Sequence, residues 1–195
     1  MMKATAEKVP EEPRATTDVK QSVQSSRSSK CLLEPTILQS QWGDFEVSIH
    51  TPPSLLKRDL KMVFPSTLPS DNILLVPTCQ HSTIDLLGRS PEVAEQKDSL
   101  LVSFMSFSSH LASLLQSCGY WADYCDPASG LPMVAPDGNV VFPEVACFER
   151  LRKYKTSSAG GCRVIVHPEW GTSIYPATFF TNAPLEVLLK ALKSL

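Results

Sequence analysis

The feature that most constrains the fold is a long segment, Glu92 to Cys118, whose apolar residues recur every three or four positions. This spacing places them on one face of a helix, so it predicts one long helix against the main core. Pro91 suits its first turn, and Gly119 suits the position just beyond its end. We interpret Phe104 and Met105 as core residues rather than part of a cofactor site, because such stripes usually pack inside. The apolar positions are Leu100, Leu101, Phe104, Met105, Leu111, Leu114, Leu115 and Cys118.

Before this segment, the pattern predicts two strands and one short helix. Residues 43–50 alternate apolar and polar side chains, which is typical of a half-buried strand with Phe45, Val47 and Ile49 on one face. The apolar run 73–76 predicts a central strand. Between them we expect a helix that Ser54 caps and that runs to about Phe64. Its inward face would consist of Leu55, Leu56, Leu60 and Val63.

After the long segment, strands predominate. We expect a strand at 120–124, a turn at 126–130, a hairpin joining 131–134 to 139–142, a short helix at 147–154 and a loop at 155–161. Residues 162–167 and 173–180 are expected to pair as antiparallel strands, and Asn182 to cap a final helix. Because strands and helices mix without a βαβ rhythm, the sequence predicts an α+β fold with a largely antiparallel sheet.

Composition bounds the domain organisation and excludes several classes of protein. Residues 1–35 are polar and predict a disordered tail, which leaves 36–195 as one domain. The net charge of -2 gives no general affinity for nucleic acid or anionic membranes, and no apolar run approaches the ~20 residues of a membrane span. The N-terminus lacks the apolar region of a signal peptide, and its glutamates fit a mitochondrial leader poorly. We therefore expect a cytoplasmic protein, with mitochondria as the alternative.

The six cysteines are best interpreted as free thiols. Their number is even, but their spacing is irregular, and a domain of this size does not need disulfide bonds. There is no Cys-x-x-Cys, and the four histidines show no recognised zinc spacing, so we expect no resident metal.

Cys162 is the main candidate for chemistry, since it directly follows Gly160 and Gly161. One interpretation is a buried strand cysteine that acts as a small hydrophobic side chain. The other is an accessible thiol, activated by N–H groups of the glycine turn and by a cation such as Arg163 or Arg152, which could ligate a soft metal centre. A catalytic pair with His167 is disfavoured, because an offset of five residues along a strand places the two side chains on opposite faces.

Other polar and aromatic residues also leave alternatives open. Asp126 and Asp137 are typical of turns in which the carboxylate bonds its own backbone. Trp121 and Trp170 fit either loop-anchoring core residues or interface anchors. The chain contains no dinucleotide-binding, Walker A or nucleophile-elbow motif.

Several segments of the C-terminal half together resemble the CblD family, the methylmalonic aciduria and homocystinuria type D proteins. They are Gly119–Tyr124, Asp126–Leu131, Gly160 with Cys162–Ile165, His167 with Trp170–Thr172, and Phe180–Ala183. Upstream, Pro53–Asp59 and Phe64-Pro65 extend the resemblance, which covers about residues 45–195.

The resemblance implies a nitroreductase-like α+β fold without enzymatic activity. It implies a non-enzymatic adaptor that binds a CblC-like cobalamin-processing protein and helps direct cobalamin to methionine synthase or methylmalonyl-CoA mutase. No cofactor would be bound by the chain alone; cobalamin would be met through the partner complex. Cys162 is the implied cobalt-ligating thiolate, with Gly160, Gly161 and Arg163 as its loop. The candidate interface residues are Tyr120, Trp121, Asp123, Asp126, Ser129, His167, Trp170, Gly171 and Thr172.

The chain departs from the family at the cysteine itself, where relatives carry two adjacent cysteines and this chain has Gly161-Cys162. Whether Cys162 takes the place of the ligating residue is therefore left open. The alternative function is a flavin-dependent reductase of nitroreductase type, although no cluster of basic residues suits a flavin phosphate. A thiol enzyme built on Cys162 is a third interpretation.

Overall fold

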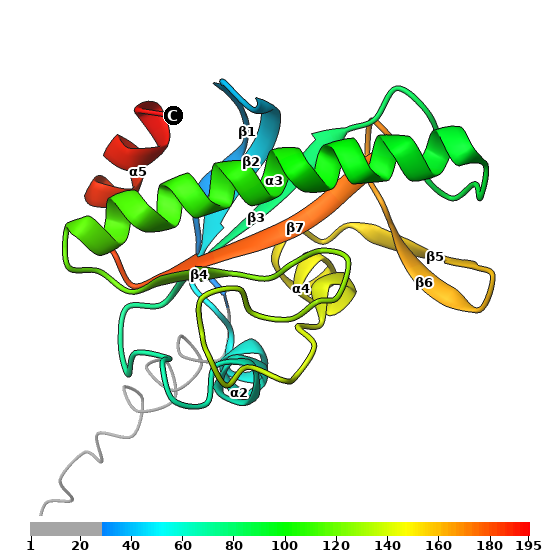
Figure 1. Ribbon diagram of the computed structural model, residues 1–195. Helices are drawn as coiled ribbons and strands as arrows, with labels where there is room; N and C mark the ends of the chain where they lie inside the picture. The colour runs from blue at the N-terminus through cyan, green and yellow to red at the C-terminus, as the bar shows by residue number, and fades with distance from the viewer. Residues whose placement is uncertain (1–28) are drawn as a thin grey trace, which may run out of the picture.

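The computed structural model describes residues 29–195, which form a five-stranded sheet, a two-stranded hairpin and four helices. The large sheet has the order β1-β2-β3-β7-β4, and every neighbouring pair is antiparallel (Figure 1). Its strands are β1 (Cys31–Ser40), β2 (Gly43–His50), β3 (Leu74–His81), β7 (Ile174–Thr181) and β4 (Ala122–Tyr124). The predicted α+β class with a largely antiparallel sheet is confirmed, and the segment 73–76 does begin the central strand.

Helices cover both faces of this sheet. On one face, α3 (Pro91–Ser117) crosses the strands and α5 (Leu185–Lys193) packs beside it (Figure 1). On the other face lie α2 (Ser54–Val63) and α4 (Glu144–Leu151). Successive strand residues serve the two layers, since Phe179 joins the α3 core and Phe180 joins the α2 core. The sheet is therefore buried on both sides.

The long predicted helix is confirmed as α3. Ser90 is its N-cap and accepts a hydrogen bond from the Val93 N–H (3.3 Å), Pro91 occupies the first turn, and Gly119 follows the C-cap with φ +83°. Phe104 is fully buried, as predicted, and Met105 packs against the same core.

Two predicted helix caps are wrong. Pro53, not Ser54, is the N-cap of α2, and Leu55 is 44% exposed while Leu56, Leu60 and Val63 face the core. Pro184 is the N-cap of α5. The Asn182 amide oxygen instead accepts the Trp121 N–H (2.8 Å), because the start of β4 lies beside the end of β7.

The predicted pairing of 162–167 with 173–180 is also wrong. Residues 155–161, predicted as a loop, form β5 (Lys155–Ala159) and a turn that returns the chain into β6 (Cys162–Val166). β7 pairs instead with β3 and β4. A two-residue glycine turn makes the local pairing available. The adjacent Phe179 and Phe180 of β7 face opposite sides and are buried within the large sheet.

The predicted hairpin between 131–134 and 139–142 does not form. Pro132 makes a single bridge with Cys125, and residues 133–142 are irregular. Proline cannot donate to a strand ladder, which limits pairing here. The following helix α4 starts at Glu144, three residues before the predicted start.

Strand β1 begins at Cys31, so the predicted domain start at residue 36 falls inside this strand. Residues 1–28 of the predicted disordered tail lie outside the described residues. Among residues 29–195, no helix has the length and apolar character needed to cross a membrane.

Candidate functional site

The predicted thiol lies at the tip of the β5–β6 hairpin, which projects beyond the large sheet (Figure 1). Ala159 pairs with Cys162, so Gly160 and Gly161 form the two-residue turn between them. Their φ angles are +56° and +86°, which glycine adopts without the strain that a Cβ brings. Cys162 is exposed. The glycines therefore hold the chain in a reversal that presents the sulfur to solvent.

The two arginines expected to activate this thiol are bonded elsewhere. Arg163 pairs with Glu149 on α4 and donates to the Thr156 hydroxyl (2.8 Å). Arg152 is buried and pairs with Glu46. The structure instead brings Arg89, from the loop before α3, to the turn: a methyl group placed on Gly160 would lie 3.5 Å from Arg89 Nη2.

A buried charge network holds the base of the hairpin. Glu46 on β2 pairs with Arg152, whose side chain is fully buried, and accepts from the Tyr154 hydroxyl (3.0 Å) and from His167 Nε2 (3.1 Å). The Arg152 guanidinium also lies over the Tyr154 ring, 4.7 Å from its centroid. Arg152, Tyr154 and His167 all lie more than 100 residues after Glu46 in the sequence. The network thus fastens both ends of the hairpin to the large sheet.

His167 has a defined tautomer within this network. Its Nδ1 accepts the backbone N–H groups of Glu169 and Trp170, each at 3.1 Å, so the ring proton is on Nε2 and is donated to Glu46. The Trp170 ring stacks on His167 with centroids 4.2 Å apart. The next residue, Gly171, closes the turn through paired backbone bonds to His167 and has φ +58°. Trp170–Thr172 is therefore a rigid turn beside the hairpin.

His167 and Cys162 stand at opposite ends of β6 rather than side by side. Cys162 begins β6 and His167 directly follows its last residue, so an offset of five residues separates them by about 16 Å at ~3.3 Å per residue. His167 is also only 3% exposed. It is buried at the base of the hairpin, which it supports through Glu46.

Asp123 is likewise buried and acts as an anchor. Its carboxylate accepts four backbone N–H groups, from Tyr124 (2.7 Å) and from three residues of the irregular loop: Met133, Val134 and Ala135 (3.3, 3.0 and 2.8 Å). Burial raises the pKa of Asp123, although the four N–H groups oppose this shift. As a fully buried group, Asp123 fixes the loop that follows β4 and does not form an exposed surface.

The turn at Asp126 bonds its own backbone, as predicted. The carboxylate accepts from the N–H of Ala128 (2.9 Å), and the hydroxyl and N–H of Ser129 (2.7 and 3.2 Å). Asp137, by contrast, accepts from the Ser66 hydroxyl across the α2 face (2.8 Å). The Asp126 turn and Arg163 line a shallow cavity together, so the structure brings these two predicted site segments to one surface.

A second cavity, of about 290 Å³, adjoins the hairpin. It is lined by Arg163, Thr172, Tyr175 and Glu144, among mostly apolar residues. Glu144 accepts from the Thr178 hydroxyl, and burial raises the pKa of Glu144 to about 7. Because Arg163 and Glu144 line both cavities, the two form one continuous region beside the hairpin.

Tyr120 and Trp121 belong to a different part of the molecule. Trp121 is half-buried against Phe64, with ring centroids 5.3 Å apart, and its carbonyl accepts from the Thr181 hydroxyl (2.7 Å). These contacts join the start of β4 to the end of β7. Neither aromatic residue lines the cavities beside the hairpin.

The remaining cysteines are not part of this site. All six lie within the described residues and are free; Cys79, Cys125 and Cys147 are buried, whereas Cys118 and Cys162 are exposed. Burial raises the pKa of each of the three buried thiols. Within residues 29–195, no group of three or more His, Cys, Asp or Glu side chains is arranged to hold a metal ion.

Sequence reasoning missed Glu46, Tyr154, Glu144 and Arg89. Glu46 occupies a polar position on a strand with regular alternation, where a solvent-facing glutamate is the usual expectation. No local signal links Glu46 to its partners at the other end of the chain. Glu144 follows Pro143 in a segment that we did not assign to a helix, so its place in a cavity wall could not be inferred.

Comparison with known proteins gives one consistent result. The family model described as methylmalonic aciduria and homocystinuria type D protein matches residues 6–193. Proteins called cobalamin trafficking protein CblD are similar over 138 residues: 35% identical in Rattus norvegicus, 32% in Homo sapiens and 30% in Gallus gallus. The aligned part is 71% of this chain and 46% of each relative. The matched region thus spans about half the length of these relatives.

Proposed function

The chain belongs to the methylmalonic aciduria and homocystinuria type D protein family, and on this basis we propose that it takes part in intracellular cobalamin trafficking. It acts as a non-enzymatic adaptor that binds a CblC-like processing protein and directs cobalamin to methionine synthase or methylmalonyl-CoA mutase. Cobalamin is the cargo, met through the partner. The nitroreductase-like form of the fold, which the family resemblance implies, is part of the same proposal.

The observation that carries the proposal is the exposed Cys162 at the end of a rigidly based hairpin. A thiol on a projecting turn can reach a metal held by another protein, whereas a thiol inside a cavity cannot. Thiolate sulfur suits a soft or borderline metal such as the cobalt of cobalamin. Arg89 beside the turn places a positive charge near a developing thiolate.

An adaptor role is favoured over thiol catalysis by the surroundings of Cys162. A nucleophilic cysteine needs a base within hydrogen-bond reach. The histidine nearest to it along β6 is at the far end of the strand and is already bonded to Glu46. The hairpin is therefore better suited to ligation across an interface.

The decisive experiment is the absorption spectrum of a cobalamin-loaded CblC-like protein with and without this chain. We expect wild-type protein to change the spectrum and Cys162→Ser to leave it unchanged while still forming the complex. Cys118→Ser is the matched control, because Cys118 is the other exposed thiol. Complex formation with identical spectra for wild type and Cys162→Ser would reject the thiolate step, and absence of any complex would reject the adaptor role.

A second variant addresses the residue before the cysteine. Gly161 occupies the turn, and a Cβ there meets no atom within 4 Å, so Gly161→Cys adds a thiol that points into open space. This variant restores the adjacent pair of cysteines found in the family. If Cys162 is the ligand in this chain, Gly161→Cys in the Cys162→Ser background will shift the spectrum differently from wild type. Recovery of the wild-type spectrum would instead show that a thiol at position 161 can take the place of Cys162, and a spectrum like that of Cys162→Ser alone would show that it cannot.

A further inference from the structure

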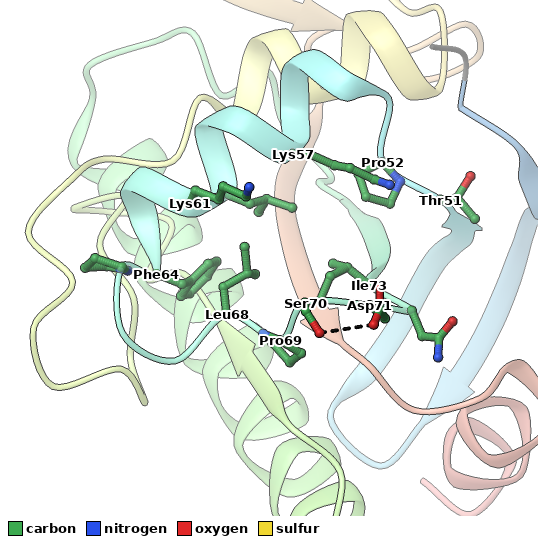
Figure 2. A pocket seen from close by; sticks show the side chains of 13 residues that line it. Thr51, Pro52, Lys57, Lys61, Phe64, Leu68, Pro69, Ser70, Asp71 and Ile73 are labelled. Atoms are coloured by element: carbon green, nitrogen blue, oxygen red, sulfur yellow. Dashed lines mark hydrogen bonds between the residues drawn. The ribbon is translucent and has the colours of Figure 1, made fainter. Parts of the chain in front are cut away.

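One large cavity lies away from the hairpin and has no part in the proposed function. It measures about 640 Å³ and lies between α2 and the segment that leads into β3. Figure 2 shows Lys57 and Lys61 along α2 on one side and Ser70 and Asp71 on the other. None of its lining residues belongs to the β5–β6 hairpin, and α2 and the hairpin lie apart in Figure 1. A pocket of this size is typical of small-molecule sites.

The charge of this cavity favours an anion. Lys57 and Lys61 are four residues apart, so both extend from the same side of α2. Neither forms an ion pair with another described residue. The nearest acid on the helix, Asp59, is instead paired with Arg150 (3.6 Å), which removes it from competition for the lysines. Two ammonium groups match the charge of a phosphate monoester, about -1.5 to -2 at pH 7, better than that of a single carboxylate.

The floor of the cavity favours a ring. Leu68 and Pro69 are half-buried and present apolar atoms to the cavity, and the core residues Leu60 and Phe64, which are fully buried, lie behind them. Phe64 is held edge-on by Trp121 and by Phe180, with centroids 5.3 and 5.1 Å away. The apolar floor is therefore preformed and gives a flat apolar group a rigid surface to pack against.

The wall opposite the lysines offers hydrogen-bond acceptors. Asp71 accepts from the Ser70 hydroxyl (3.1 Å) and keeps further lone pairs for a ligand. Asn72 beside it has φ +58°, a left-handed conformation that asparagine tolerates and that reverses the chain before β3. A carboxylate near an anion site is favourable only if the ligand also carries hydroxyl or amino donors.

We propose that this cavity binds a ring-bearing organic phosphate of the nucleoside monophosphate class. The phosphate lies between Lys57 and Lys61, the ring packs on Leu68 and Pro69 above the buried Phe64, and hydroxyl or amino groups of the ligand donate to Asp71. No bond is made or broken. The site is independent of Cys162, so it would remain if the proposed cobalt ligation were disproved.

The test is calorimetric titration of the full chain with adenosine 5′-monophosphate, with adenosine and inorganic phosphate as partial ligands. We expect saturable binding of the nucleotide. Each partial ligand should bind at least about tenfold more weakly, because adenosine lacks the charged contact and inorganic phosphate lacks the apolar one. Lys57→Gln and Lys61→Gln should each weaken nucleotide binding by about fivefold or more. Because both side chains are exposed, neither change should alter the melting temperature.

Arg58→Gln is the matched control. This substitution removes one positive charge from the same helix, but Arg58 does not line the cavity. It should leave the dissociation constant within about twofold of wild type. Absence of nucleotide binding to the folded wild-type chain would overturn the proposal. Equal weakening by Arg58→Gln and by the two lysine variants would also overturn it, because that result indicates non-specific attraction to a basic helix. Binding of phosphate alone as tightly as the nucleotide would overturn it as well.

Discussion

Replacement of Glu46 by glutamine should destabilise the protein strongly, because it leaves a buried positive charge without a partner. The Arg152 side chain is fully buried and that of Glu46 is 12% exposed. Breaking a buried pair by removing one partner costs about 3–5 kcal/mol, because the remaining charge stays desolvated. Arg152 Nε already has no hydrogen-bond partner among the described residues, so little compensation is at hand. For a domain of this size the loss corresponds to a fall of roughly 6–20 °C in melting temperature.

The control is the same substitution in an exposed pair of the same kind. Glu149 pairs with Arg163, whose side chain is 60% exposed, and such surface pairs contribute about 0–1 kcal/mol. Urea unfolding of Glu46→Gln and Glu149→Gln measures the difference directly. A loss below about 1 kcal/mol for Glu46→Gln, or equal losses for the two variants, would refute the argument from burial.

The same substitution should loosen the hairpin more than the rest of the sheet. Glu46 is the anchor to which Tyr154 and His167, at the two ends of the hairpin, are bonded. Hydrogen exchange in β5 and β6 should therefore accelerate in Glu46→Gln beyond the global change, and exchange in β3 should not. Adding Arg152→Met should recover part of the lost stability, because the unpaired charge is removed.

Three further changes test separate parts of the structure. Gly161→Ala should cost about 1–2 kcal/mol in urea unfolding, since φ is +86° there, and Gly161→Asn should cost less. Asp123→Ala should cost at least about 2 kcal/mol of stability and speed hydrogen exchange at residues 133–135. Replacement of the exposed Asp137 by alanine should cost under about 1 kcal/mol. Equal losses for the two variants would disprove the anchoring role of Asp123. Burial raises the pKa of Glu144 from 4.5 to about 7, so the folded state holds its proton more tightly than the unfolded state. Stability from this group is therefore greatest below pH 4.5 and falls as the pH rises toward 7, so Glu144→Gln should flatten the melting temperature over that range relative to wild type.

Sequence patterns were sufficient where a structure depends on neighbours along the chain. The helical repeat of residues 92–118 predicted α3 because its apolar face follows from a period of 3.6 residues. Alternation likewise predicted β2, with Phe45, Val47 and Ile49 buried on one face. The adjacent glycines made an accessible thiol one of two interpretations of Cys162, and the structure shows Cys162 exposed. The family also followed from the sequence, since its motifs are contiguous or closely spaced.

The tertiary structure decided which distant segments meet. β6 pairs with β5 and not with β7, because two positive φ angles close the local hairpin while β7 buries phenylalanines on both sides of the large sheet. Glu46 meets Arg152 and His167 only after β2 and the end of the hairpin are brought together, and no periodicity encodes contacts over more than 100 residues. Asp123 and His167 gave the same signal in sequence as exposed interface residues, but folding buried them. Short-range periodicity fixes which face of an element is apolar; long-range packing determines what that face, and each polar residue beside it, will contact.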